Sequence, residues 1–382
     1  MSERAQKLAL GAVVIALVCF FLYPATHAQQ GKVRGEWRIT VRDGQRVLGM
    51  KTTGSDWLGR HGTSFTQPVS DFRNFSIPNF AEGQPATFSL VRDAGTVQFE
   101  GSGQGARGSG EFVFEPNADF IAAMRGLGYS GLSDERLFSM ALLNVDRAFI
   151  SGLDAEGYSR LDVDTLIAMR IHGADASFIR ALREQGYTRL STDDLIAMRI
   201  HGATPEFVRE MRAAGYDQLS ADQLIAFRIH GISPEFVREA KALGTSRPSP
   251  DDLVALKIHG SSPQFWRELQ ELGYSRPSVD DVVAMKIHGV QTSFIRELRE
   301  LGYESVAMDD LVAMKIHGVQ TSFIRELREL GYARVSVDQL IAMRIHGVDA
   351  GFIRETNRKG GTRLSIDDLI EQRIVPHKRN WV

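Results

Sequence analysis

The amino-acid sequence predicts an α+β multidomain protein, in which a small antiparallel β domain is followed by an α-solenoid of 29-residue helix-pair repeats. Two observations support this fold class. From about Gly31 to Glu115, apolar and polar residues alternate with period two, as in half-buried strands. Beyond that point phenylalanine, glycine and histidine recur every 29 residues, which is the signature of a stacked repeat array.

The N-terminal segment has the composition of an export signal. Basic residues precede the apolar run Leu8–Tyr23, and Thr26 and Ala28 supply the small residues of a cleavage site. We therefore expect residues 1–28 to be a signal peptide, the mature chain to begin at Gln29, and the protein to be periplasmic or secreted. In the alternative, the run is not cleaved and residues 8–23 anchor the protein to the inner membrane.

Composition excludes several classes of function. The formal net charge is −2 and 43% of the residues are hydrophobic, so a folded protein is expected and neither nucleic acid nor an anionic membrane is favoured as a partner. Cys19 is the single cysteine and lies in the expected signal. The mature protein would then have no disulfide, no thiol nucleophile and no cysteine-ligated metal.

The β domain is expected over residues 29–117. Trp37 to Arg42 alternates apolar and polar residues, and Asp43-Gly44 supplies a hairpin turn before the next strand. Further strands are predicted at Ala86 to Val91, Thr96 to Glu100 and Glu111 to Glu115. The long irregular stretch between these two groups carries Phe72, Phe75 and Phe80, which we expect to form a satellite core or, alternatively, a ligand-facing surface.

One stretch of this domain matches a nucleotide-binding fingerprint by its letters. Gly103, Gly105 and Gly108 have the spacing GxGxxG. The fingerprint requires a strand-to-helix turn that directs a helix N-terminus at pyrophosphate, whereas here strands are expected on both sides. A glycine-rich hairpin is therefore predicted, and no cofactor.

Each 29-residue unit is predicted to contain two helices, which we name the first-type and the second-type helix. In one copy Ser191 is an N-cap, and the first-type helix ends at His201 with Gly202 as the left-handed cap. Thr204 and Pro205 then open the second-type helix. About nine such units are expected over residues 118–376, followed by a C-terminal tail at 377–382.

Neither helix, at roughly nine residues, would persist alone in water, so successive units must bury each other's apolar arcs. In one second-type helix Phe294 and Leu298 share the apolar arc, and Arg296 is placed to pair with Glu300. The 21 residues from Val283 to Tyr303 recur unchanged 29 positions later. This identity indicates selection on stacking and argues against a unique chemical site in either copy.

A histidine stands near the end of most first-type helices and is followed by glycine. We name these residues the histidine ladder: His172, His201, His230, His259, His288, His317 and His346. We expect partly buried structural caps that donate to free helix-end carbonyls. Metal binding or pH sensing is the alternative, but equivalent side chains in stacked units point in parallel and do not converge on one ion.

A cation stands two residues before each of these histidines. We name these residues the basic ladder: Arg170, Arg199, Arg228, Lys257, Lys286, Lys315 and Arg344. They are expected either to pair with aspartates of a neighbouring unit or, with the isoleucines and leucines beside them, to form a stripe that binds an acidic partner. This stripe is the candidate binding surface.

The unit that runs from Asp193 to Glu210, DDLIAMRIHG followed two residues later by PEFVRE, resembles repeats of bacterial cell-envelope proteins. Some of those proteins carry the repeats behind an antirepressor-type sensor metallopeptidase domain embedded in the membrane. The resemblance covers Asp119 to Val375 and implies an exported helical-repeat interaction module. The peptidase motif His-Glu-x-x-His is absent from this chain, so the resemblance does not imply peptidase activity.

The sequence thus favours an exported, monomeric, non-enzymatic scaffold whose helical repeats bind a protein or peptide of the cell envelope, with no metal and no nucleic acid. A membrane contact is expected only if the N-terminal segment is uncleaved. Two alternatives remain open. One is a membrane-anchored sensory or regulatory ectodomain, and the other is an enzyme in the β domain with the solenoid as a targeting arm.

Overall fold

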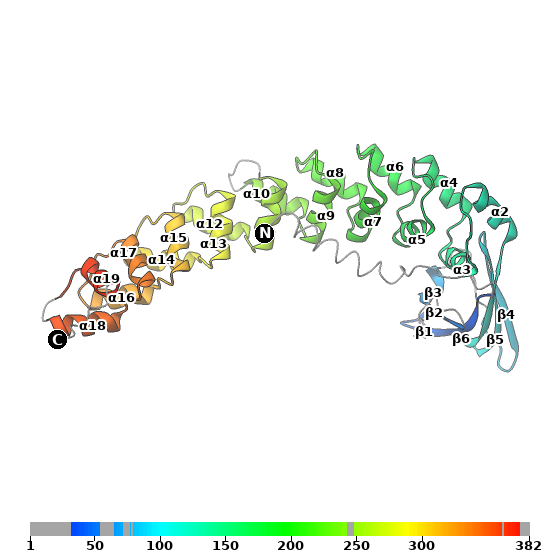
Figure 1. Ribbon diagram of the computed structural model, residues 1–382, viewed down its shortest axis with the longest axis horizontal. Coiled ribbons are helices and arrows are strands. Elements are labelled where there is room, and N and C mark those ends of the chain that lie inside the picture. Colours follow the sequence, from blue (N-terminus) through cyan, green and yellow to red (C-terminus); the bar gives the residue numbers. More distant parts are fainter. Residues whose placement is uncertain are drawn as a thin grey trace, which may run out of the picture. The chain divides into compact units, whose positions relative to one another are not determined.

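The computed structural model describes residues 32–53, 65–71, 77, 79–242, 248–360 and 363–374 (Figure 1). The expected signal peptide with Cys19, the C-terminal tail, Phe72 and Phe75 lie outside the described residues. The chain has a β domain followed by a helical-repeat solenoid, which confirms the predicted fold class. In the part of the chain that is described, no helix is both long enough and apolar enough to cross a membrane.

The β domain is one six-stranded antiparallel sheet with the strand order β3-β2-β1-β6-β5-β4. The short edge strand β3 and the extension of β5 and β6 into the glycine-rich stretch were not predicted from the sequence. The strands are β1 (Arg34–Arg42), β2 (Gln45–Thr53), β3 (Phe65–Pro68), β4 (Pro85–Arg92), β5 (Gly95–Gln104) and β6 (Arg107–Pro116).

The core of the sheet is built around Trp37. Its indole Nε1 donates to the backbone carbonyl of Glu100 at 3.1 Å, and its ring lies 5.9 Å from Phe80 and 6.2 Å from Phe99. All three rings are buried. Phe80, which was expected in a satellite core or on a ligand-facing surface, therefore belongs to the main core of the domain.

The GxGxxG stretch is the hairpin between β5 and β6, as predicted. Gln104 pairs with Arg107 across the turn, and Gly105 has a φ of 59°, which favours glycine. Phe80 exchanges two backbone hydrogen bonds with Gly105, at 2.8 and 2.9 Å. A Cβ atom at Gly108 would lie 2.8 Å from the Phe80 ring, and one at Gly103 would lie 2.3 Å from the Arg107 carbonyl oxygen and 2.8 Å from the same ring, so neither position has room for a side chain.

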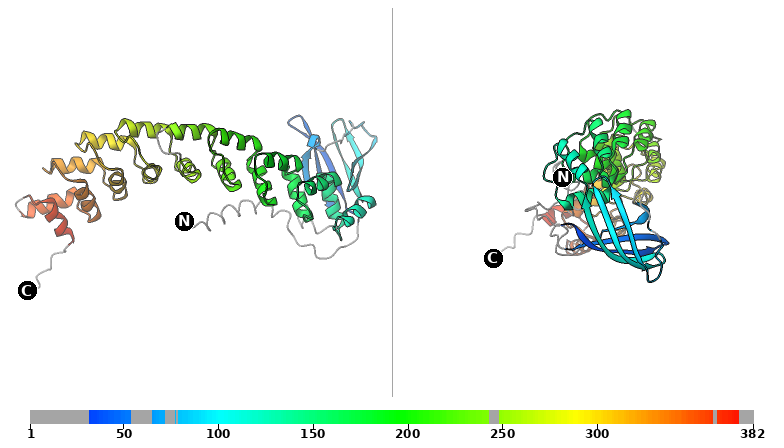
Figure 2. Two further views of the ribbon diagram at one scale, coloured as in Figure 1. Left: turned by 90° about the horizontal axis from the view of Figure 1, so that it is seen from above. Right: turned by 90° about the vertical axis from the view of Figure 1, so that its right-hand side faces the viewer.

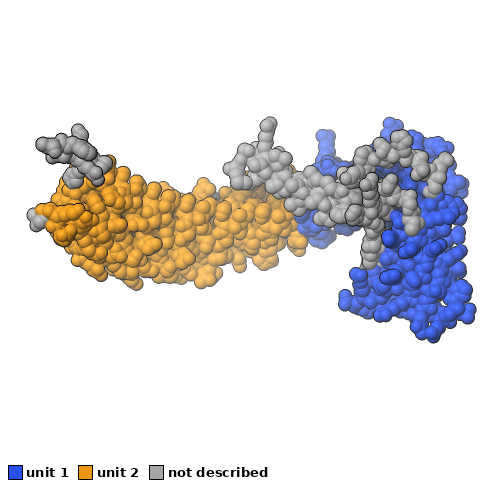
Figure 3. All heavy atoms as spheres, turned by 60° about the horizontal axis from the view of Figure 1, so that its bottom comes forward, with its two compact units in different colours: residues 1–209 blue, residues 210–382 orange. Residues whose placement is uncertain are grey.

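The chain divides into two compact units, unit 1 (Met1–Arg209) and unit 2 (Glu210–Val382) (Figure 3). Within each unit the helices lie in two layers (Figure 2). Unit 1 contains the first-type helices α3 (Asp134–Leu143), α5 (Val163–His172) and α7 (Thr192–His201). Its second-type helices are α2 (Ala118–Gly126), α4 (Arg147–Ala155) and α6 (Ala176–Glu184). Helix α8 (Pro205–Ala213) spans the division between the units.

Unit 2 continues the same alternation, and helices of one type contact each other in successive turns of the array. The first-type helices are α9 (Ala221–Ile229), α11 (Pro250–Ile258), α13 (Val279–Ile287), α15 (Met308–Ile316), α17 (Val337–Ile345) and α19 (Ile366–Ile374). The second-type helices are α10 (Pro234–Ala242), α12 (Pro263–Glu271), α14 (Thr292–Glu300), α16 (Thr321–Glu329) and α18 (Ala350–Gly360).

The predicted capping signals account for the helix ends. Ser278 accepts from the backbone N–H of Asp281, whose carboxylate accepts from the Ser278 N–H in return, which forms a capping box at α13. At the other end Gly289 has a φ of 69°, and the Val290 N–H donates to the Met285 carbonyl at 2.8 Å.

Arg296 does not have the partner that its spacing suggested. Its guanidinium lies 3.6 Å from the Glu268 carboxylate of the preceding second-type helix, and the hydroxyl of Thr292 donates to the same carboxylate. Glu300 was expected instead, because it is one helical turn away. Stacking brings a carboxylate of the adjacent helix within reach, and the ion pair therefore joins two units.

In unit 1 the β domain and the first helices share one core. Phe138 of α3 stacks on Phe112 of β6, with ring centroids 5.5 Å apart and an interplanar angle of 6°. It also meets Phe114 edge-on at 5.4 Å. The secondary structure changes from strand to helix between Pro116 and Ala118, but compact packing continues to Arg209. The sheet and the first helices therefore bury aromatic rings against each other.

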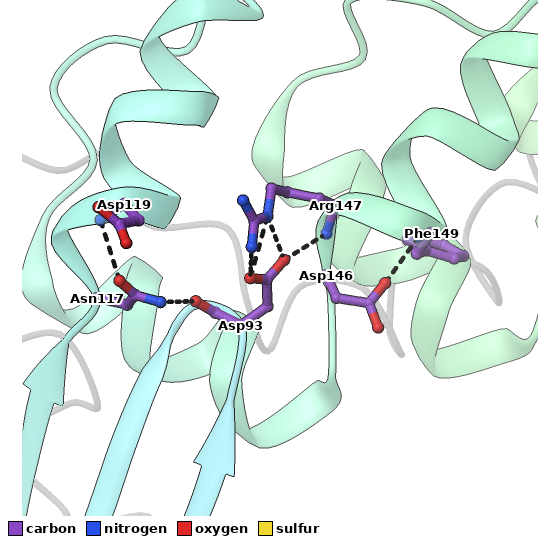
Figure 4. A network of polar contacts seen from close by, with 6 residues as sticks. All are labelled: Asp93, Asn117, Asp119, Asp146, Arg147 and Phe149. Carbon is purple, nitrogen blue, oxygen red and sulfur yellow. Dashed lines mark hydrogen bonds and ion pairs between the residues drawn. The ribbon is translucent and has the colours of Figure 1, made fainter.

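A polar network reinforces this joint (Figure 4). Asp93, in the turn between β4 and β5, accepts from the backbone N–H of Arg147 at 2.9 Å and from its guanidinium Nη2 at 2.6 Å. Asn117 donates to the Asp93 carbonyl at 3.1 Å and also caps α2. The hydrogen bond from Arg147 holds the pKa of Asp93 below its usual range.

Candidate functional site

The basic ladder lies over the phenylalanines of the preceding repeat. The Lys286 ammonium is 4.8 Å from the centroid of Phe265, and that of Lys315 is 4.3 Å from Phe294. These are cation–π contacts, and the rings beneath are buried. The same contact is made by Arg170 on Phe149, Arg199 on Phe178, Lys257 on Phe236 and Arg344 on Phe323. One repeat beyond the ladder, Arg373 makes it on Phe352.

Two arginines of the ladder also cap helix ends. Arg199 Nε donates to the carbonyl of His172 at 3.1 Å, and Arg170 Nε to that of Leu143 at 3.2 Å. Each acceptor is an otherwise free carbonyl at the C-terminus of the preceding first-type helix. Rings and carbonyls are thus partners of the ladder, and a neighbouring aspartate interacts with it as well. Although burial alone would raise it, the pKa of Asp175 is lowered by hydrogen bonds from Ser177 and the Phe178 N–H and by the charge of Arg199.

The second-type helices use the same device, which sequence reasoning missed. The Arg183 guanidinium donates to the Glu156 carbonyl at 2.7 Å, and Lys241, Arg299 and Arg328 donate to the carbonyls of Ala214, Leu272 and Leu301. Donor and acceptor are 27 residues apart in every case. At the repeat position of these cations, residue 270 is glutamine. The cation is therefore not present in every repeat, and its period of 29 is less apparent in the sequence than that of the basic ladder.

Between the basic and histidine ladders stands an exposed isoleucine. In the described residues the large hydrophobic side chains with the greatest exposure are Val91, Leu127 and seven isoleucines at this one repeat position, each 41–54% exposed. Ile200, at the same position, is half-buried. We name the seven the isoleucine ladder: Ile171, Ile229, Ile258, Ile287, Ile316, Ile345 and Ile374.

Helix geometry explains why this position is outside the core. Met285, on the other side of Lys286, is fully buried, and Ile287 is two residues further, roughly 200° around the helix axis. The predicted stripe included the apolar residues on both sides of each cation, and the structure differs from this expectation. The residue before each cation belongs to the core, and only the isoleucine after it reaches solvent.

The histidine ladder occupies helix ends, as its sequence context suggested. His172 is the last residue of α5, and His288 is the C-cap of α13. His172, His201 and His230 are half-buried, whereas His259, His288, His317 and His346 are exposed. Burial lowers the pKa of His172. Among the described residues, no group of three histidines, cysteines or carboxylates is arranged to hold a metal ion.

Because the glycine that follows makes the backbone cap, the imidazole of His288 is expected to contribute little to stability. We expect His288→Asn to change the free energy of unfolding by less than about 0.5 kcal/mol. Gly289→Ala should cost about 1–2 kcal/mol, since it places a Cβ in the left-handed region. Urea denaturation followed by circular dichroism measures both. A saturable rise in Tm with zinc that disappears in His288→Asn would instead identify a metal site.

A fourth ladder consists of tyrosines that join one unit to the next by a hydrogen bond. Tyr303 follows the second-type helix α14 and donates its hydroxyl to the Val335 carbonyl at 2.7 Å. Burial raises the pKa of this phenol. The same hydrogen bond, 32 residues forward, is donated by Tyr158 to Leu190, by Tyr216 to Pro248, by Tyr274 to Val306 and by Tyr332 to Leu364.

Removing one of these hydroxyls is expected to weaken the array measurably. Tyr303→Phe should cost about 1 kcal/mol at neutral pH, because the Val335 carbonyl loses its donor. The raised pKa means that this stability is present below about pH 10 and is lost as the pH rises above it, since the unfolded chain releases its proton first. Urea denaturation at pH 7 and above pH 10 should show the difference between parent and variant shrinking at alkaline pH. An unchanged difference would contradict this linkage.

A pocket of about 380 Å³ opens next to the isoleucine ladder in unit 2. It is bounded by the cation–π pair on one side and by the start of α14 on the other. Its lining residues are Phe265, Lys286, Val290, Gln291, Thr292 and Ser293. Lys286, which lines the pocket, immediately precedes the exposed Ile287 in α13.

No protein-family model matches this chain, and no curated protein sequence is significantly similar to it.

Proposed function

We propose that the protein is an exported, non-enzymatic scaffold that binds a protein or peptide of the cell envelope through the isoleucine ladder. The observation that carries this proposal is the concentration of exposed large hydrophobic side chains at one position of the repeat. Apolar side chains scattered singly over a surface need no explanation, but a periodic row is typical of an interaction surface. Export is supported by the signal-like N-terminus and by the resemblance of the repeats to cell-envelope modules.

The energy available from this surface is adequate for specific binding. Completing the burial of a half-exposed isoleucine contributes about 1 kcal/mol, which is roughly half of its full transfer free energy. Six of the seven isoleucines lie in unit 2, so a partner that covers several of them gains several kcal/mol from apolar contact alone. The nearby cations add charge selectivity to this contact.

The test compares capture of envelope proteins by matched variants. The parent and a triple variant, Ile287→Ser with Ile316→Ser and Ile345→Ser, are immobilised and exposed to a solubilised envelope fraction. A partner retained by the parent should be lost from the triple variant, with an expected cost of about 3 kcal/mol or roughly 100-fold in affinity. Val91→Ser, which removes a still more exposed apolar residue of the β domain, serves as the control and should retain the partner.

If the triple variant captures the same proteins as the parent, the isoleucine ladder is not the binding surface. If the Val91→Ser control alone loses the partner, binding belongs to the β domain. Either result would contradict the proposed function.

A further inference from the structure

We infer that the isoleucine ladder of unit 2 binds an extended, acidic polypeptide segment that presents one apolar side chain at every third residue. This inference rests on the proposed binding function and specifies the chemistry of the partner. Four features support it: the spacing of the ladder, its width, the charge of the residues beside it and the pocket at Lys286.

The spacing of the ladder matches an extended chain. Successive first-type helices such as α13, α15 and α17 contact each other, so their axes lie about 8–10 Å apart. Equivalent isoleucines on these helices therefore recur at about the same interval. A polyproline II chain rises about 3.1 Å per residue with three residues per turn, so every third side chain lies on one face about 9 Å from the last. A pleated strand repeats on one face every second residue, at about 6.7 Å, and does not match.

The width of the row also favours such a ligand over a helix. Each unit exposes a single isoleucine, for example Ile287, because Met285 and Val282 of the same helix are buried. A polyproline II segment presents one side chain per turn on a given face, which fits a row one residue wide. An amphipathic helix presents residues three and four apart on a broad arc and needs a wide groove to cover them.

The charge beside the ladder selects for acidic residues in the partner. Lys286 and Lys315 lie over phenylalanine rings directly next to the exposed isoleucines Ile287 and Ile316. The N-caps of the second-type helices that follow these isoleucines are neutral, Gln291 and Gln320, and neither makes a side-chain capping hydrogen bond. A carboxylate of the partner that enters the pocket of about 380 Å³ meets the Lys286 ammonium, Gln291 and Ser293, while the Thr292 hydroxyl in the same lining already donates to Glu268.

Other occupants fit less well. A second copy of this chain would bring one row of cations against another, which is unfavourable. An anionic membrane surface is usually engaged by aromatic anchors and by extended cationic side chains. Trp266, the tryptophan described in unit 2, is buried and offers no such anchor.

The experiment uses the full chain and synthetic peptides of Leu-Pro-Asp triplets carrying a fluorophore, with binding read by anisotropy. Control peptides keep the composition but move leucine to irregular spacing, or replace aspartate by lysine. We expect the triplet peptide to bind at least about tenfold more tightly than either control. Ile287→Ser with Ile316→Ser should weaken binding about tenfold or more, whereas Val91→Ser should leave it unchanged. Lys286→Gln with Lys315→Gln should remove most of the salt dependence.

Several results would overturn the inference. One is that the irregular or lysine peptides bind as tightly as the triplet peptide, and another is that a helical peptide with leucine at heptad spacing binds more tightly. The others are binding to anionic vesicles that depends on the isoleucine ladder, and self-association of the protein that the isoleucine variant abolishes. Failure of every peptide would also overturn it. The proposed function would still stand if the envelope fraction yields a partner whose capture depends on the ladder, so the two failures are distinguishable.

Discussion

Deletion of residues 304–320, which removes the first-type helix α15 but keeps α16, is expected to abolish cooperative folding of unit 2. The deletion removes Leu311 and Met314, both fully buried, and takes away the helix that α13 and α17 both contact. Truncating one such side chain typically costs about 2–5 kcal/mol. Losing the whole helix therefore approaches the total stability of about 5–15 kcal/mol that a domain possesses. Thermal unfolding followed by circular dichroism should show a broad, early transition.

The matched control is deletion of the complete unit, residues 304–332. It should leave a folded protein with one repeat less, because α14 then meets α17 and α18 in the arrangement it formerly had with α15 and α16. Tyr303 would take the position of Tyr332 and donate to the Leu364 carbonyl instead of Val335. If this control loses its helical signal as completely as the half-unit deletion, the array has long-range contacts that nearest-neighbour stacking does not include.

Phe138→Ala is expected to have the second-largest effect, a loss of about 3–5 kcal/mol in the free energy of unfolding. The ring is 3% exposed and contacts Phe112 and Phe114 of the sheet, so its removal leaves a cavity at the joint between the β domain and the helices. Urea denaturation measures the loss. Limited proteolysis should show the β domain cleaved before the helices of unit 2.

Phe138→Leu is the matched control, since it keeps most of the volume and should cost less than half as much as Phe138→Ala. A loss below about 1 kcal/mol for the alanine variant would show that the sheet and α3 do not share a core. Acid pH provides a second check on this joint. Because the pKa of Asp93 is depressed, the stability that its bonds to Arg147 contribute is present above about pH 4 and is lost as the pH falls.

The fold was predictable because its signals are local and repeated. The capping residues, the left-handed glycines and the apolar arcs of a single unit determine two helices, and the period of 29 multiplies them along the chain. Strand β3 was not predicted, since its four residues include a proline and no regular alternation. The role of Phe80 was also missed, because its contacts are with a hairpin 25 residues further on, which spacing does not reveal.

The candidate site was predicted only in part. Both the basic ladder and the phenylalanines beneath it have the same period, so the sequence cannot indicate which lysine covers which ring. The offset of 21 residues between Phe265 and Lys286 follows from how the units stack. The exposure of the isoleucine ladder, in contrast, could have been predicted from the sequence. Ile287 lies on the opposite side of α13 from Met285, and a helical projection of that helix would have placed it in solvent.

In the repeated 21-residue copies, Arg299 and Arg328 cap the preceding second-type helices, and this has a consequence for heredity. A duplicated copy of such a unit contains the arginine that donates to the helix-end carbonyl of the preceding unit. The arginine of the following unit donates to its own helix-end carbonyl, so the insertion preserves these hydrogen bonds. Gene-level unequal crossover can therefore lengthen or shorten the protein in whole units without compensating mutations elsewhere. The two unaltered 21-residue copies from Val283 and from Val312 are consistent with such an event. The number of repeats should accordingly vary between natural alleles more readily than the identity of the residues that form the contacts between successive units.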